Sequence, residues 1–186
     1  MPSNPSNREV AQRFLNHVFV DRIDWSDEHH KDTPVRFVKM LRELTSQEEP
    51  EFTTFKANTD EMVIVKDIPF NSLCAHHIIP FVGYCHIGYI PGGTIAGLSK
   101  FARVVKYLSA TLTVQEDLNR DIALYLMSKL QPKGIAVVME AEHMCMTLRG
   151  VQVPGTKTIT SSMHGVFADH NRLARQEFLE LIRDRK

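Results

Sequence analysis

The chain has 186 residues, of which 22 are basic and 22 are acidic, so its formal net charge is zero. This balance argues against a broad nucleic-acid-binding surface, which needs a basic excess, and no apolar run is long enough to span a membrane. Residues 1–7 lack the pattern of a signal peptide, and three cysteines form no disulfide framework, so we expect a cytoplasmic protein.

Apolar residues at helical spacing predict two helices in the first part of the chain. Ser6 and Glu9 match a capping box, and the apolar positions behind them continue to Phe19. Thr33 and Pro34 form a favourable helix start, because proline suits the first helical position. Polar segments predict connections at residues 21–32 and 47–60.

The periodicity changes after residue 60. Segments rich in Val, Ile, Phe and Tyr predict strands at residues 61–70, 81–90, 135–141 and 143–153. Helical patterns begin at Ser99 and Thr113, and a last amphipathic helix covers 169–183. This order predicts an α+β fold, with an antiparallel sheet backed by helices and an N-terminal helical segment. We expect a single domain over residues 1–186, with a mainly helical part at 1–60 and the core at 61–186.

Two short segments offer metal-binding side chains. Cys74 and His77 form Cys-x-x-His, and His143 lies two residues before Cys145. Thiolate and imidazole are the usual ligands of zinc, and three protein ligands leave a fourth position open, as in catalytic sites. In a strand, His143 and Cys145 would share a face, whereas the adjacent His76 and His77 would diverge. A bend between Cys74 and His77 is required if both are to reach one ion.

Core packing is an equally good explanation when spacing alone is considered. A single Cys-x-x-His is a weak signal, and Cys85 illustrates the alternative, because it lies in an apolar run and is more typical of a small buried hydrophobe. The sequence pattern therefore leaves a zinc site and a packed core as alternatives.

Longer motifs favour the zinc site over the packed core. The chain carries SLCAHHIIPFVGYCHIGYIP, GLSKFARVV, LTVQEDL, AVVMEAEHMCMTLRGV and PGTKTITSSMHGVF in this order, preceded by TPVRFVKM. With these motifs it resembles the GTP cyclohydrolase I family, which converts GTP to formate and 7,8-dihydroneopterin triphosphate. The resemblance implies a tunnelling fold, zinc as cofactor, GTP as substrate, and a ring-shaped homodecamer with active sites between subunits. It implies no nucleic-acid or membrane partner.

The resemblance also implies a role for each matching residue. Cys74, His77 and Cys145 would hold zinc, and His76 and His143 would transfer protons. Glu116 would anchor the guanine base, with Gln115 beside it. The triphosphate would be bound by the remaining polar residues of the motifs, which are Ser99, Lys100, Arg103, Arg149, Arg36 and Lys39.

Elementary helix geometry agrees with the phosphate-binding roles. Lys100 and Arg103 are three residues apart and share a helical face, and a helix start at Ser99 offers backbone N–H groups to an anion. Solvated surface charge is the alternative for each of these residues. For Glu116 the alternative is a capping box with Thr113.

The mechanism that follows begins with protonation of guanine N7 by His76 or His143. Water then adds to C8, the ring opens to a formamide, and a second hydrolysis releases formate. A departure from the family is Ala75, where relatives commonly carry Glu. The competing interpretations are a related tunnelling-fold enzyme acting on a pterin or deazaguanine, and a non-catalytic oligomer stabilised by zinc. A third is a catalytically weakened homologue, which only Ala75 indicates.

Overall fold

The computed structural model describes residues 5–20, 22–168 and 173–183. Contacts divide the chain into two units, residues 1–46 and 47–186, and each is described separately. The prediction that both form a single domain stays a prediction.

The N-terminal unit is a pair of helices, α1 (Asn7–Phe19) and α2 (Thr33–Thr45). Both predicted starts are confirmed. The Ser6 side chain accepts a hydrogen bond from the Glu9 backbone while the Glu9 carboxylate accepts one from the Ser6 backbone, and Pro34 lies in the first turn of α2. The rings of Phe14 and Phe37 stack with their centroids 6.3 Å apart, which packs α1 against α2.

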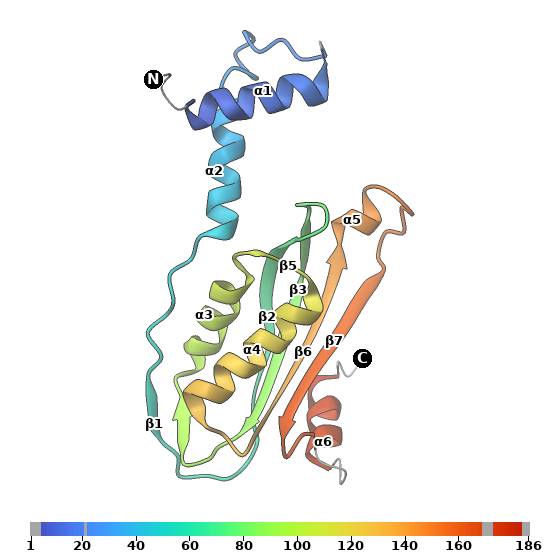
Figure 1. Ribbon diagram of the computed structural model, residues 1–186. Helices are drawn as coiled ribbons and strands as arrows, with labels where there is room; N and C mark the ends of the chain where they lie inside the picture. Colours follow the sequence, from blue (N-terminus) through green and yellow to red (C-terminus); the bar gives the residue numbers. More distant parts are fainter. Residues whose placement is uncertain (1–4, 21, 169–172, 184–186) are drawn as a thin grey trace. The chain divides into compact units, whose positions relative to one another are not determined.

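The second unit is built on a five-stranded sheet in the order β5-β2-β3-β6-β7 (Figure 1). All neighbouring strands are antiparallel except β5 and β2. The strands are β2 (Val63–Cys74), β3 (Pro80–Ile90), β5 (Leu112–Thr113), β6 (Gly134–His143) and β7 (Lys157–Gly165). Two short strands, β1 (Thr54–Lys56) and β4 (Thr94–Ala96), form a separate antiparallel pair.

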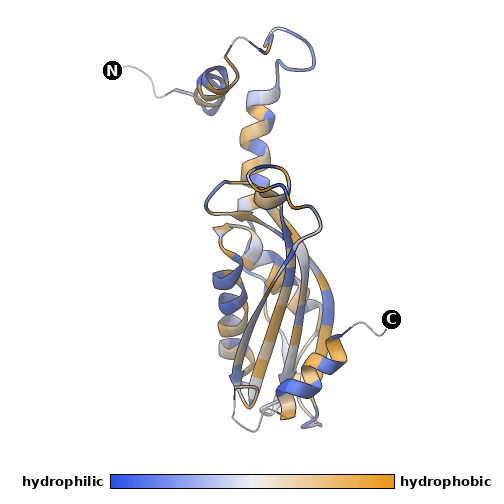
Figure 2. Cartoon of the chain, turned by 90° about the vertical axis from the view of Figure 1, so that its right-hand side faces the viewer, coloured by the Kyte–Doolittle hydropathy of each residue, from blue (hydrophilic) through white to orange (hydrophobic). Residues whose placement is uncertain are grey.

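Helices cover the sheet on both faces. Helices α3 (Leu98–Ser109) and α4 (Gln115–Leu130) pack on one face, and α6 (Leu173–Ile182) packs on the other, as the turned view in Figure 2 shows. Phe101, Val104 and Ile122 bring the apolar stripes of α3 and α4 into the main core. Cys85 lies in this core, and burial raises the pKa of its thiol, so the prediction of a buried hydrophobe is confirmed.

The predicted strand over residues 143–153 is wrong. The strand β6 ends at His143, and Met144–Thr147 form the short helix α5. The reason is topological: β7 returns antiparallel to β6 from Lys157, so the chain must reverse between these residues. Gly150 and Gly155, both at positive φ, help the connection to turn.

The sequence analysis also missed β7. In this strand Thr158 and Thr160 hydrogen-bond to the buried amides of Gln115 and Asn119 on α4. Because this inward face is polar, the usual alternation of apolar inside and polar outside is lost. The run of Thr and Ser was the available signal, since Thr favours strands.

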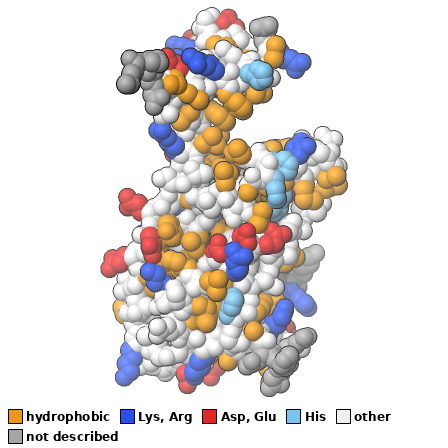
Figure 3. Space-filling view, in the orientation of Figure 1, with side chains coloured by type: hydrophobic (Ala, Val, Ile, Leu, Met, Phe, Trp, Pro, Cys, Tyr) orange, Lys and Arg blue, Asp and Glu red, His pale blue; other side chains and the backbone are white. Residues whose placement is uncertain are grey.

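With these corrections, the predicted α+β architecture of an antiparallel sheet backed by helices is confirmed. Residues 169–172 of the last predicted helix lie outside the described residues. No helix in the described part of the chain combines the length and apolar character needed to cross a bilayer. On the face of the second unit shown in Figure 3, acidic and basic side chains are interspersed.

Candidate active site

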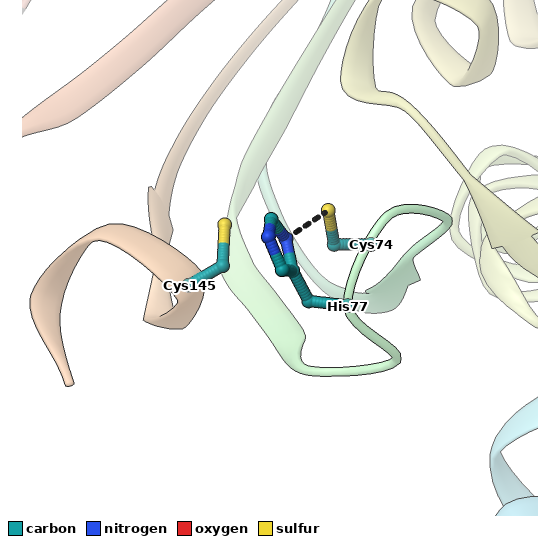
Figure 4. A group of neighbouring side chains, drawn as sticks. All are labelled: Cys74, His77 and Cys145. Carbon is teal, nitrogen blue, oxygen red and sulfur yellow. Dashed lines mark hydrogen bonds between the residues drawn. The ribbon is translucent and has the colours of Figure 1, made fainter. Parts of the chain in front are cut away.

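Three side chains from separate segments converge at one end of the sheet. Cys74 is the last residue of β2, His77 lies in the turn before β3, and Cys145 lies in α5. One ligand atom from each lies within 4.8 Å of the others, and the three side chains point toward one another in Figure 4. We call this group the Cys-His-Cys cluster, and the end of the sheet that carries it the cluster end.

A tight turn brings His77 back over Cys74. The backbone N–H groups of His77 and Ile78 donate to the carbonyl oxygen of Cys74, at 3.2 and 2.8 Å, and the Cys74 N–H donates to the Ile79 carbonyl at 3.0 Å. Ile78 adopts a positive φ of 56°, which closes the turn. The bend predicted between Cys74 and His77 is therefore present.

The cluster fits a zinc ion by chemistry and by size. Ligands of a tetrahedral zinc lie about 3.6–3.8 Å from each other, given Zn–S and Zn–N bonds of about 2.3 and 2.0 Å. The Cys74 Sγ and His77 Nδ1 atoms are 3.9 Å apart. Burial raises the pKa of the Cys145 thiol, and the adjacent Cys74 raises it further. A bound cation would offset both effects, because metal binding displaces the thiol protons.

The second predicted histidine of the turn, His76, also lies beside Cys74. Its Nδ1 is 3.7 Å from the Cys74 Sγ, and its ring centroid is 6.1 Å from that of His77. Both imidazoles therefore approach the same sulfur, with the His77 Nδ1 at 3.9 Å, and the divergence predicted for an extended chain is not seen, because the segment forms a turn. Among the described residues, only Cys74, His77 and Cys145 meet as a metal-binding group, so His76 is left for another task.

His143 is held firmly beside the cluster. Its ring stacks on Phe81 with a centroid distance of 4.7 Å and an interplanar angle of 1°, and its Nε2 lies 2.8 Å from the Gln115 Oε1. Burial lowers the pKa of His143, while the Glu116 carboxylate acts in the opposite direction. The lowered pKa favours the neutral ring near pH 7, a form that can accept a proton.

Gln115 and Glu116 begin the helix α4. The predicted capping box between Thr113 and Glu116 is wrong, because the N-cap is Val114 and its side chain makes no capping bond. The short strand β5 ends at Thr113, which moves the helix start by one residue. Gln115 is fully buried, whereas Glu116 is exposed and close enough to His143 to influence its titration.

Comparison with known proteins now gives the cluster a context. The family model described as GTP cyclohydrolase I matches residues 10–183. The GTP cyclohydrolase 1 of Sulfurihydrogenibium sp. (strain YO3AOP1) is 49% identical over 158 residues, which cover 84% of each chain. That of Listeria welshimeri is 48% identical and covers 82% of this chain and 83% of its own.

The chain belongs to the GTP cyclohydrolase I family. Membership confirms the resemblance drawn from the sequence motifs. A solved structure titled as the archaeosine synthase QueF-Like in the apo form aligns with 58% of this chain and 97% of its own. Its TM-score is 0.49 and its sequence identity to this chain is 16%.

In this member of the GTP cyclohydrolase I family, the basic residues predicted for the triphosphate do not gather at the cluster. Ser99 and Lys100 lie in the first turn of α3, and Lys100 is about 14 Å along the helix axis from Ser109, where α3 reaches the cluster end. Arg103 is exposed between them. Arg149 is nearer, since it influences the pKa of Cys145. None of the described hydrogen bonds joins Ser99, Lys100 or Arg103 to the Cys-His-Cys cluster.

Arg36 and Lys39 belong to the N-terminal unit. Both are largely exposed on α2, where Arg36 lies 3.9 Å from Asp32 and Lys39 lies 3.6 Å from Glu43. These are surface pairs one helical turn apart, and they contribute little to stability. Both cations therefore stay available for an anion.

The sequence analysis missed Phe81, which stacks on His143. Phe81 and His143 are directly paired across β3 and β6. No motif spacing carries that information, because strand register is a tertiary property. An aromatic residue seven positions after Cys74 was the available sign, and it indicated only a buried strand.

Proposed function

We propose that this chain is a zinc-dependent GTP cyclohydrolase I, which hydrolyses GTP at C8 of guanine to give formate and 7,8-dihydroneopterin triphosphate. The observation that carries the proposal is the convergence of Cys74, His77 and Cys145 beside His143 in a chain of this family. A zinc ion held by the three would supply a Lewis acid and a hydroxide source at neutral pH.

The two histidines are proposed as the groups that move protons. His143 is neutral near pH 7 because burial lowers its pKa, so it is suited to exchange a proton with guanine N7. His76 lies in the same turn as His77, with its Nδ1 3.7 Å from the Cys74 Sγ, and is available for a second transfer. Protonation of N7 makes C8 electrophilic, and addition of water there opens the imidazole ring.

Glu116 is proposed to bind the guanine base. It is exposed in the first turn of α4 and close to His143, so a base held by its carboxylate would present N7 to the histidine. A carboxylate can accept hydrogen bonds from both the ring N–H and the exocyclic amine of guanine. Gln115 precedes it and is proposed as part of the same end of the site.

The triphosphate is proposed to lie against Ser99, Lys100, Arg103 and Arg149, with Arg36 and Lys39. Their guanidinium and ammonium groups suit phosphate oxygens. Lys100 donates one hydrogen bond to the Glu51 carbonyl at 2.8 Å, and two of its three donors are left for a phosphate. The distance of α3 residues from the cluster supports sites shared between copies, as in the ring-shaped homodecamer expected for this chain. We place the enzyme in the cytoplasm.

Incubation of purified protein with GTP and zinc tests the proposal. We expect formate release together with a product that oxidises to fluorescent neopterin, and loss of both after chelation of zinc. Turnover of a pterin or deazaguanine substrate without formate release from GTP would favour the related tunnelling-fold enzyme. Bound zinc with no turnover of any of these compounds would favour the non-catalytic oligomer.

A further inference from the structure

Gln115 has an unusual position for a residue at the start of a helix. Its side chain has 0% exposure, and every polar atom of its amide has a partner. The Nε2 atom lies 3.2 Å from the Met139 carbonyl oxygen, 3.1 Å from the Thr158 carbonyl oxygen and 3.1 Å from the Thr160 Oγ1. The Oε1 atom lies 2.8 Å from the His143 Nε2.

These partners fix the orientation of the amide. The carbonyl oxygens of Met139 and Thr158 only accept hydrogen bonds, so they require the NH₂ group of Gln115. Rotation of the amide by 180° would place Oε1 against the two carbonyl oxygens, so that three hydrogen-bond acceptors would face one another without a donor. The oxygen of Gln115 must therefore face His143.

The orientation of Gln115 in turn fixes the proton of the neutral His143 ring. An amide oxygen is an acceptor, so the His143 Nε2 must carry the hydrogen that it accepts, and Nδ1 is left with a lone pair. Stacking on Phe81 at 4.7 Å prevents the ring from tilting away from this bond. Within the described parts of the chain, no side chain or backbone group hydrogen-bonds to His143 Nδ1.

We propose that Gln115 is a positioning residue that holds His143 as the Nε2–H tautomer, so that Nδ1 is the nitrogen that exchanges protons with the substrate. The proposal rests on the proposed role of His143 in proton transfer. Gln115 is fully buried beside Glu116, so it acts on the reaction through His143. In this tautomer Nδ1 can take up a proton from solvent and deliver it to guanine N7, whereas in the opposite tautomer the nitrogen that faces Gln115 would lack the hydrogen that the amide oxygen accepts.

Asn119 provides a matched control for this role. It lies one helical turn after Gln115 on α4, is 1% exposed, and its Nδ2 approaches the Val137 and Thr160 carbonyl oxygens at 3.5 and 3.3 Å. It therefore ties α4 to β6 and β7 in the same manner as Gln115 does, without contacting His143. A variant at Asn119 measures the effect of losing a buried amide between helix and sheet.

The tautomer of His143 can be measured without any change at Gln115. In zinc-loaded protein labelled with ¹⁵N-histidine, the protonated and unprotonated ring nitrogens give well-separated resonances, and a His143→Asn variant identifies the pair that belongs to His143. We expect the Nε2 resonance to be of the protonated type and Nδ1 of the unprotonated type. The reverse pattern, or an even mixture of both, overturns the proposal.

Kinetics of two variants then test the consequence. In Gln115→Met, which has a similar length but no hydrogen-bonding amide, we expect kcat for formate release to fall about 10²-fold through misorientation of the ring, with KM for GTP within about twofold. In Asn119→Leu, kcat should stay within about threefold of the parent value. Equal losses of kcat in the two variants would reduce Gln115 to a structural tether and contradict the proposal.

The role of His143 in proton transfer and the role of Gln115 in positioning it can be contradicted separately. If His143→Ala retains full formate release, the proposed role of His143 is wrong, although the ¹⁵N measurement can still show that Gln115 sets its tautomer. If His143→Ala is inactive but Gln115→Met keeps its kcat, the role of His143 stands and the positioning role of Gln115 is wrong.

Discussion

The two ends of the sheet differ in the side chains that they carry and in how firmly these are held. At the cluster end, sulfur and imidazole groups from β2, the following turn and α5 meet within 4.8 Å, and His143 is fixed between Phe81 and Gln115. At the far end, where α3 begins and α4 finishes, the basic side chain of Lys100 is turned to a backbone carbonyl. Farther along α3, Arg103 is exposed.

This difference indicates what one chain can assemble by itself. The groups proposed as metal ligands and as the proton-transfer histidine lie at strand ends or in the segments next to them, where the register of the sheet holds them in place. The residues proposed to bind the flexible, highly charged triphosphate lie on exposed helix surfaces, which a second copy of the chain could reach if the site is shared as proposed. The predictions below test the two ends in turn.

The largest effect is expected from Cys145→Ser. A serine hydroxyl is a much poorer zinc ligand than a thiolate, so we expect zinc content to fall to near zero and formate release to be lost. Zinc per chain is measured by atomic spectroscopy after gel filtration, and formate is measured in the same sample.

Cys85→Ala is the matched control for this change. Cys85 is buried in the middle of β3, where it pairs with Met139 of β6 and not with a residue of the Cys-His-Cys cluster, so its variant should keep both zinc and activity, with a modest loss of stability. Full turnover by metal-free Cys145→Ser would show that the cluster end has no part in the reaction.

A smaller but still large effect is expected from His143→Ala. Removal of a proton-transfer group should lower kcat about 10²- to 10⁴-fold while zinc stays bound. His164→Ala is the control, because His164 lies on β7 and its ring bonds to Ser162 at 3.0 Å, apart from the cluster. A similar fall of kcat in both variants would mean that the loss at His143 reflects general disturbance of the sheet.

The cluster end was also the part of the site that the sequence predicted best. Cys74 and His77 are three residues apart, so a turn alone brings them together, and their residue types indicate a metal. The assignment of Cys145 needed the family resemblance, since the strand predicted for it is wrong. The spacing of residues within one segment does not determine which distant strand pairs with that segment.

The same limit explains the misses elsewhere. Phe81 faces His143 because β3 and β6 pair in one register. The strand β7 was missed because its inward face is polar, with the Thr160 hydroxyl accepting a hydrogen bond from the Gln115 amide. Most helices were predicted because their apolar stripes and start signals are local.

The far end is tested by Arg103→Ala. Loss of a charge-assisted bond to phosphate should raise KM for GTP about tenfold and leave zinc content unchanged. If the site is shared, co-expression of Arg103→Ala with Cys145→Ser chains should combine an intact cluster with an intact Arg103 in about a quarter of the sites, by random assembly.

At GTP concentrations below KM, such mixed assemblies should therefore reach about a quarter of the parent rate. If each chain instead uses its own Arg103, only half of the sites keep a cluster, and all of these lack the arginine. Because each such site is about tenfold slower below KM, the total rate should be about a twentieth of the parent rate. Gel filtration of the two tagged chains, captured together, provides the control for co-assembly.

The smallest effect is expected at Glu49, which precedes β1 and contacts the last turns of α4 at the far end of the sheet. The Tyr125 hydroxyl donates to the Glu49 carboxylate at 2.8 Å, and Lys129 lies 3.0 Å from the same carboxylate. Burial, together with this bond to Glu49, raises the pKa of Tyr125 to about 12. Because the pKa in the folded protein is raised, the stabilisation is fully present below about pH 10, the pKa of free tyrosine, and is lost as pH rises toward 12.

Absorbance of the ionised phenol during an alkaline titration measures this pKa, with a Tyr125→Phe protein to identify the signal. Glu49→Gln removes the negative charge but keeps an acceptor, so the pKa of Tyr125 should fall while zinc content and formate release stay at parent levels. An unchanged pKa in Glu49→Gln would mean that Glu49 does not hold this segment on α4. A loss of zinc in the same variant would show that the two ends of the sheet are coupled, whereas distant sites that share no partner are expected to act independently.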